Sequence, residues 1–434
     1  MKQTNNTSYV IRLSKFFLLA SIATTFVKIP SFHQYYRMSD LFLLISFIFI
    51  TNLFFNKYID FKKNKNIIVA ILFIIATNIL GTILSYLIYK TLPLRDVLLN
   101  YARLSSCIMI YYEIIIISQV DKTFIKKSII CLMGSLIIIP ISHIMKKIGI
   151  IDYLMFDPTR FSGLLIDPNY FANFQIIPTI LLLYFAIKDN NKYIYKILAF
   201  IGFMFSISMI LWSGSRSGIL GLIVAIFLLF FFYIKFTKTS IFKILITILI
   251  LILSFPIGTI LIPRYKNENL QTKTSNENNQ QSLIIKDITS ENQKTRLESF
   301  SNISDAVTSN DRLLIWKSSI KFIKQNPFGY GPGYNQIINL HGDVGSNRVV
   351  HNFELELILQ GGLLLFIFIN YSLLKLLIKT YNIIKFKYFN EIHALVSIMI
   401  GLLISGLFLD SMPEKWVWII LALIVSYNIE EIIN

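Results

Sequence analysis

An arginine among serines and glycines is the first candidate for chemistry. The stretch LWSGSRSGIL (211–220) places Arg216 between two long apolar segments. A guanidinium binds phosphate through two parallel hydrogen bonds. The small neighbours let the backbone approach a ligand, and the start of the next helix offers free N–H groups to an anion. An arginine at a helix end can instead only reach lipid headgroups. The stretch therefore indicates phosphate binding or a surface anchor.

A histidine lies at the start of a later apolar segment, in VVHNFELELILQGGLLLF (349–366). The imidazole of His351 is suited to accept a proton near neutral pH, although a lone histidine is often only structural. Asn352 beside it is a candidate for substrate binding. Glu354 lies within one turn and is expected to orient His351 or to bind a sugar hydroxyl. The alternative for Glu354 and Glu356 is that acids favour a helix N-terminus.

Two further stretches carry weaker signals. PTRFSGLLIDPNYFANF (158–174) contains Arg160, Asp167 and Asn169. The arginine is a candidate for diphosphate binding, and the other two are candidates for substrate binding, although Asp-Pro-Asn is also an ordinary turn and N-cap signal. GYGPGYN (329–335) lacks the Lys-Ser/Thr of a phosphate-binding loop, and turn chemistry explains its glycines.

The composition is that of a membrane protein. The chain has 434 residues, of which 55% are hydrophobic, and uncharged runs recur from end to end. The runs are continuous and not alternating, which argues against a β-barrel. Cys107 and Cys131 both fall inside apolar runs, away from any disulfide or metal-ligand pattern. We therefore expect an all-α polytopic membrane protein that needs no bound metal and no cofactor.

The hydropathy pattern predicts about twelve membrane-spanning helices. Their approximate ranges are 13–29, 40–56, 66–89, 97–120, 128–145, 169–187, 193–212, 218–234, 241–263, 353–378, 392–409 and 416–429. This division gives nine spans in residues 1–263, a large loop over 264–352, and three spans in 353–434. The loop should contain an amphipathic helix that begins near Asp311 as its N-cap.

Clusters of lysines lie in or beside alternate gaps between these spans. The clusters are Lys57, Lys62, Lys63 and Lys65; Lys122, Lys126 and Lys127; Lys188, Lys192 and Lys196; Lys235, Lys238 and Lys243; and Lys375, Lys379, Lys385 and Lys387. The positive-inside rule makes these gaps and both termini cytoplasmic. This distribution accounts for the net charge of +17 and argues against nucleic-acid binding.

The other gaps, including the large loop, are then extracytoplasmic. They carry Arg160, Arg216, Arg264, Arg312 and His351. Topology does not explain arginines on this side, because the positive-inside rule concerns the opposite face. The sequence thus predicts an anionic ligand, most simply a diphosphate, at the extracytoplasmic surface with one possible base beside it.

These stretches, taken in order, resemble the O-antigen ligase / O-antigen polymerase superfamily. The resemblance rests on SGSRSGILGL, then DRLLIWKSSIKFIKQNPFGYGPGYN in the large loop, then HNFELELILQGGLLLF, with RFSGLLIDPNYFANF upstream. It covers residues 160–374, and the earlier spans match only in being apolar.

The resemblance implies a GT-C-like, inverting, metal-independent membrane glycosyltransferase. Such a protein transfers a glycan from an undecaprenyl-diphosphate carrier to an acceptor hydroxyl at the outer face of the cytoplasmic (inner) membrane. The family's essential arginine matches Arg216, and its loop-end histidine matches His351. Its further loop arginine matches Arg264 or Arg312, and the spacing leaves both open.

Several activities share these motifs. The favoured one is a polymerase of O-antigen or capsular polysaccharide, whose acceptor is another lipid-linked repeat unit and whose implied partners are a chain-length regulator and a flippase. The alternatives are a ligase that transfers glycan to lipid A-core in lipopolysaccharide synthesis, and a protein O-oligosaccharyltransferase. A transporter or flippase of lipid-linked sugars is the alternative from another class, but the chain shows no duplicated halves.

Overall fold

The structure is a computed structural model of the chain. It describes residues 2–27, 37–55, 65–147, 161–165, 167–188, 192–237, 310–341, 350–385, 387–409 and 414–433. The elements in this part of the chain are thirteen helices. The first eight are α1 (Lys2–Ala23), α2 (Met38–Phe55), α3 (Lys65–Tyr89), α4 (Leu94–Val120), α5 (Phe124–Lys147), α6 (Pro168–Ile187), α7 (Tyr193–Ser213) and α8 (Arg216–Phe236). The others are α12 (Asn310–Gln325), α13 (Tyr334–His341), α14 (Phe353–Ile384), α15 (Glu391–Gly406) and α16 (Lys415–Ile433).

The molecule is a multi-pass membrane protein. Six of the described helices, α3, α4, α6, α7, α8 and α14, are long and apolar enough to cross a bilayer. Met38–Thr51 in α2 and the whole of α15 are shorter apolar helices. Every predicted span except the ninth overlaps a helix, and the ninth (241–263) lies outside the described residues. The all-α class is confirmed, whereas the number of spans and the GT-C likeness stay predictions.

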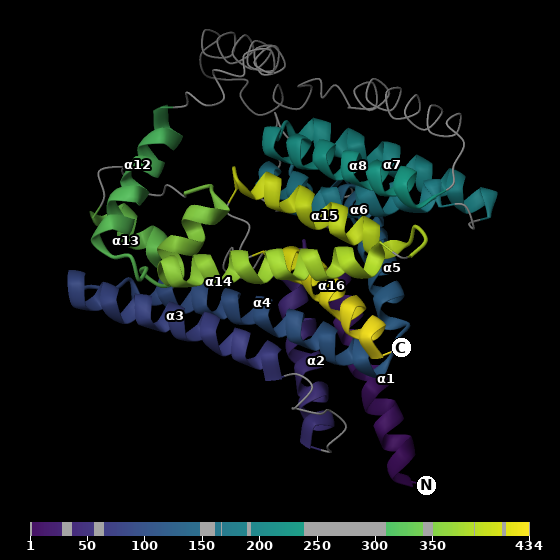
Figure 1. Cartoon of the computed structure of the whole chain (residues 1–434), viewed down its shortest axis with the longest axis horizontal. Helices are drawn as coiled ribbons and strands as arrows, with labels where there is room; N and C mark the ends of the chain where they lie inside the picture. The colour runs from purple at the N-terminus through teal and green to yellow at the C-terminus, as the bar shows by residue number, and fades with distance from the viewer. Residues whose placement is uncertain are drawn as a thin grey trace, which may run out of the picture.

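The helices pack as a layered bundle. Figure 1 shows α7 and α8 along one side, α3 and α4 along the opposite side, and α14, α15 and α16 between them. The contacts agree, because α15 packs on α8, α14 on α3 and α16 on α4. Helices suit these segments because a bilayer offers no water to their backbone polar groups.

One end of the bundle gathers the starts of α2, α4, α6, α8, α14 and α16. Trp416 in α16 donates its Nε1 proton to Asn173 Oδ1 in α6 at 2.8 Å. A Cβ atom on Gly218 in α8 would lie 2.5 Å from that of Ala172 in α6. Asn352, which precedes α14, bonds the carbonyl of Leu407 after α15. We call this the arginine end, because it holds the predicted extracytoplasmic gaps that the structure describes.

The opposite end of the bundle contains the remaining gaps, which are the lysine-rich ones, and we call it the lysine end. Lys15 pairs with Asp121 at 2.8 Å, and Lys188 lies 3.9 Å from Glu391. Partial burial tends to raise the pKa of Asp121, but hydrogen bonds from Lys15 and Thr123 outweigh it and lower the pKa. The helices therefore alternate in direction as the predicted gaps require. The side of the membrane that each end faces stays a prediction.

The predicted span at 353–378 contains a sharp break that the sequence analysis does not anticipate. Gly362 has φ 74° and ψ −176°, which interrupts α14 after its first part (353–361). The segment 327–331 fills the break: Leu363 N–H donates to Pro327 O at 2.9 Å, and Gly331 N–H donates to Gln360 O at 2.7 Å. The GYGPGYN stretch is thus a turn, as predicted, and it also satisfies backbone groups that the break exposes.

The amphipathic helix of the large loop is confirmed as α12, which packs on α14. Ile315 and Phe322 are buried, and Trp316 Nε1 donates to Val350 O at 3.0 Å. The helix begins at Asn310, so Asp311 lies in its first turn and not at the N-cap, and the start of the helix differs from the expectation by two residues. The next helix, α13, stacks His341 on Tyr89 of α3 with ring centroids 4.2 Å apart.

The break at Gly362 can be tested by adding a methyl group. Gly362→Ala should lower the free energy of unfolding by at least about 1–3 kcal/mol, because this backbone conformation is almost restricted to glycine. The new Cβ would also lie 2.5 Å from the Phe328 carbonyl carbon. Gly134→Ala is the matched control, since a Cβ there has nothing within 4 Å. Thermal unfolding in detergent compares the two; equal stability would contradict the described break.

Candidate active site

The α7–α8 turn sets the position of Arg216. Gly214 adopts a left-handed conformation with φ 60° and ends α7. Ser215 then caps α8, and its Oγ accepts a hydrogen bond from Gly218 N–H at 3.3 Å. The predicted tight turn is therefore present. Arg216 is the first residue of α8 and is exposed at the arginine end.

The upstream motif packs directly against this turn. Phe161 N–H donates to Trp212 O at 3.3 Å, and the two rings stack with centroids 4.4 Å apart. The ring of Phe161 also meets Phe171 of α6 edge-on at 5.0 Å. Two stretches separated in sequence thus form one unit. Arg160, the residue just before it, lies outside the described residues.

Asp167 has a clear local role. Its Oδ1 accepts hydrogen bonds from the backbone N–H groups of Asn169 at 2.6 Å and Tyr170 at 3.4 Å. It is therefore the N-cap of α6, which is the alternative that the Asp-Pro-Asn signal left open. Contact of Asp167 or Asn169 with a substrate stays a prediction.

His351 lies at the same end of the bundle, in an unusual backbone conformation. Its φ is 47°, in the left-handed region that residues other than glycine seldom adopt. Asn352 follows as the N-cap of α14, since its Oδ1 accepts from Leu355 N–H at 2.9 Å. Its Nδ2 donates to Leu407 O, also at 2.9 Å, which ties the segment to the end of α15.

The helix α15 links this histidine to Arg216. Near its end, Gly401 lies against Gly221 of α8, where an added Cβ would come within 2.5 Å of the Gly401 carbonyl oxygen. Because α15 touches α8 there and binds Asn352 just beyond, the starts of α8 and α14 lie at one end. The N-termini of α6, α8 and α14 all point to this end, and each carries a partial positive charge that favours an anion.

The acids of α14 make contacts within that helix. Glu354 Oε2 accepts a hydrogen bond from Asn370 Nδ2 at 3.0 Å, which joins the parts of α14 on either side of the break. Glu356 is buried and accepts from Gln360 Nε2 at 3.0 Å. The proposed action of Glu354 on His351 stays a prediction.

The other predicted arginines are not placed by the structure. Arg264 lies outside the described residues. The backbone of Arg312 lies in the first turn of α12, but its side chain is not among those described. The choice between them stays open. In the described part of the chain no three His, Cys, Asp or Glu side chains group as metal ligands. That a metal is not required stays a prediction.

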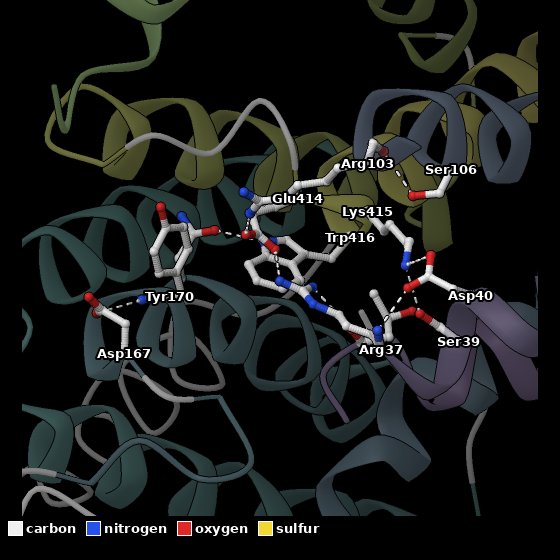
Figure 2. A network of polar contacts seen from close by, with 12 residues as sticks. Arg37, Ser39, Asp40, Arg103, Ser106, Asp167, Tyr170, Glu414, Lys415 and Trp416 are labelled. Carbon is white, nitrogen blue, oxygen red and sulfur yellow. Dashed lines mark hydrogen bonds and ion pairs between the residues drawn. The ribbon is translucent and has the colours of Figure 1, made fainter. Parts of the chain in front are cut away.

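A buried ion network at the arginine end was missed by the sequence analysis (Figure 2). Arg37 Nη2 pairs with Glu414 Oε2 at 2.5 Å, and Arg103 Nη2 pairs with Glu414 Oε1. Lys415 Nζ pairs with Asp40 Oδ1 at 2.5 Å. The network joins α2, α4 and α16. The available signal was Arg103, a charge inside a predicted span, which by itself indicates a functional or paired position.

The fold and these contacts define a helical membrane protein with an exposed arginine and a strained histidine at one end. Residues 201–369 match a family model described as O-antigen ligase. This segment, which contains Arg216 and His351 and is less than half of the chain, is therefore similar to that family. The match excludes α1, α2, α4 and α16. A search of curated proteins gave no match.

The role of Glu414 can be tested through stability. Glu414→Gln leaves two largely buried arginines without a charge partner, so the free energy of unfolding should fall by about 3–5 kcal/mol. Glu430→Gln in α16, the helix that directly follows Glu414, is the matched control and should change it by less than about 0.5 kcal/mol. Chemical unfolding in detergent measures both; a Glu414→Gln protein as stable as the control would show that the network adds no stability.

Proposed function

We propose that the protein is a polysaccharide polymerase of the O-antigen or capsular type. It transfers a glycan from an undecaprenyl-diphosphate carrier to a lipid-linked repeat unit at the outer face of the cytoplasmic membrane. The observation that carries the proposal is that Arg216 and His351, both inside the family-matched segment, lie at one end of the bundle. The lysine end faces the cytoplasm, and the large loop (264–352) faces outward.

Each residue has a separate task in this reaction. Arg216, with Arg264 or Arg312 and with Arg160, binds the diphosphate of the donor and stabilises the charge that develops on it as it leaves. The imidazole of His351 accepts the proton of the attacking sugar hydroxyl, and Glu354 orients it. In this proposal Asn352, Asp167 and Asn169 contact the sugars. The left-handed backbone of His351 supports its role, because such strain concentrates at functional sites.

Replacing the two central residues tests this assignment. Arg216→Ala should lower the rate by about 100- to 1000-fold, because a preorganised donor to the transition-state charge is lost. His351→Ala should lower it by about 100- to 10,000-fold through loss of the base. The readout is polymer length and amount in cells, with membrane levels of each variant measured in parallel.

Matched controls come from the same end of the bundle. Arg95 is an exposed arginine in the first turn of α4, and His341 is an exposed histidine at the end of α13. Arg95→Ala and His341→Ala should leave polymer length unchanged. Normal polymer in the Arg216 and His351 variants would remove both residues from the mechanism.

The family description favours a ligase as the second candidate. Purified protein supplied only with lipid-linked repeat units should produce a ladder of lengthening products if it is a polymerase. A ligase should produce none until lipid A-core, or for the protein-modifying group a polypeptide, is added as acceptor. A protein that only moves lipid-linked sugars should extend no chain in either mixture.

A further inference from the structure

The ion network at the arginine end has properties of a binding site as well as of a structural contact. The side chain of Glu414 is 1% exposed and that of Arg37 is 8% exposed, whereas that of Arg103 is 17% exposed. The least accessible group is thus the shared carboxylate, and the most accessible of the three is a guanidinium. Arg103 is thus the more accessible of the two arginines, and the other accessible side chain of the network is that of Asp40, at 23% exposed.

The charges within the network do not balance. Glu414 is shared by Arg37 and Arg103, and Lys415 is paired with Asp40. These five side chains therefore carry one positive charge in excess. The nearby carboxylate of Asp167 is directed at backbone N–H groups of α6. Excess positive charge in poorly solvated surroundings attracts an anion more strongly than it would in water.

The guanidinium of Arg37 is held rigidly. It lies over the ring of Trp416 at 4.9 Å from the centroid, and its Nη1 donates to Thr25 O at 3.1 Å. Trp416 is fully buried and bonds to Asn173 of α6. Buried ion networks seldom add stability over apolar packing, so a preorganised one is better explained by what it positions.

The ion network and the α7–α8 turn that carries Arg216 pack against two neighbouring residues of α6. Gly218 beside Arg216 contacts Ala172, whereas Trp416 of the network bonds to Asn173. The network belongs to α2, α4 and α16, none of which lies in the family-matched segment. The arginine end therefore has two cationic sites separated by the start of α6.

We propose that Arg103, positioned by Glu414 and Arg37, binds the diphosphate of the acceptor, a second polyprenyl-diphosphate-linked sugar. This inference rests on the proposed polymerase function, since a polymerase must hold two such lipids at once. Arg216 binds the donor. The phosphate of an ordinary anionic phospholipid has related chemistry, and the experiment includes it as a competitor.

The test counts bound lipids. Undecaprenyl diphosphate is titrated onto the full-length protein in nanodiscs of neutral lipid, and native mass spectrometry gives the stoichiometry. The wild-type protein should bind two molecules, and Arg103→Ala and Arg216→Ala should each bind one. Arg95→Ala, in the same helix as Arg103, should bind two. Arg103→Lys, which keeps the charge and the pairing with Glu414, should weaken the second binding event about tenfold or more, because an ammonium cannot bind phosphate bidentately.

Three outcomes would overturn the assignment. They are two molecules still bound by both Arg103 variants, a single molecule bound by the wild type, and displacement of the second molecule by an equal concentration of phosphatidylglycerol. The count is independent of turnover. A wild-type protein that makes a ladder with Arg103 variants unaffected would leave the polymerase standing without this site. Two sites with no ladder would instead contradict the proposed function.

Discussion

The backbones of α8 and α15 touch at Gly221 and Gly401, and the arrangement of the arginine end depends on this contact. A Cβ on Gly401 would lie 2.7 Å from the Gly221 carbonyl oxygen, so neither position accepts a side chain without movement. Small residues are the usual means by which membrane helices approach closely, because lipid supplies little hydrophobic drive for association. The contact holds the end of α15, which binds Asn352, beside the start of α8, which carries Arg216.

Polar groups inside the bundle are paired with other groups of the protein. At the break in α14, backbone groups freed by Gly362 are satisfied by the loop at 327–331. At the start of α16, the carboxylate of Glu414 is satisfied by two guanidiniums. Both solutions place irregular backbone or charge only where protein surrounds it, as a bilayer requires. Both also fix loops and side chains at the end of the bundle where the proposed chemistry takes place.

The sequence predicts the periodic and compositional features of this fold well. Long uncharged runs indicate the helices, and the alternation of lysine-rich gaps indicates their directions. It does not predict the break at Gly362, because Gly361 and Gly362 lie within a predicted span (353–378) and the contacts that fill the break come from the distant loop at 327–331. Of the network around Glu414 only Arg103 gives a signal, as a charge inside a predicted span, and its partners are not predictable because Arg37 and Glu414 are far from it in sequence and share no motif with it. The candidate site is predictable only in part. Arg216 and His351 can be identified from local stretches of sequence, but their position at the same end of the bundle depends on the contacts of α15 with α8 and Asn352.

The start of α6 separates the two cationic sites in the proposed arrangement, and this position has a mechanistic consequence. Phe171, Ala172, Asn173 and Phe174 are all fully buried, so the segment is held by packing on every side. In the proposed arrangement this rigid segment keeps the two diphosphates and their like charges apart, while the acceptor sugar reaches the donor sugar beside Arg216 and His351. A polymerase gains from such a separation, because the bond between the donor sugar and its diphosphate breaks at one site, the donor carrier then leaves as undecaprenyl diphosphate, and the acceptor carrier with the lengthened glycan stays at the other. A ligase has one diphosphate to hold, so it would have no need of a second cationic site built from α2, α4 and α16.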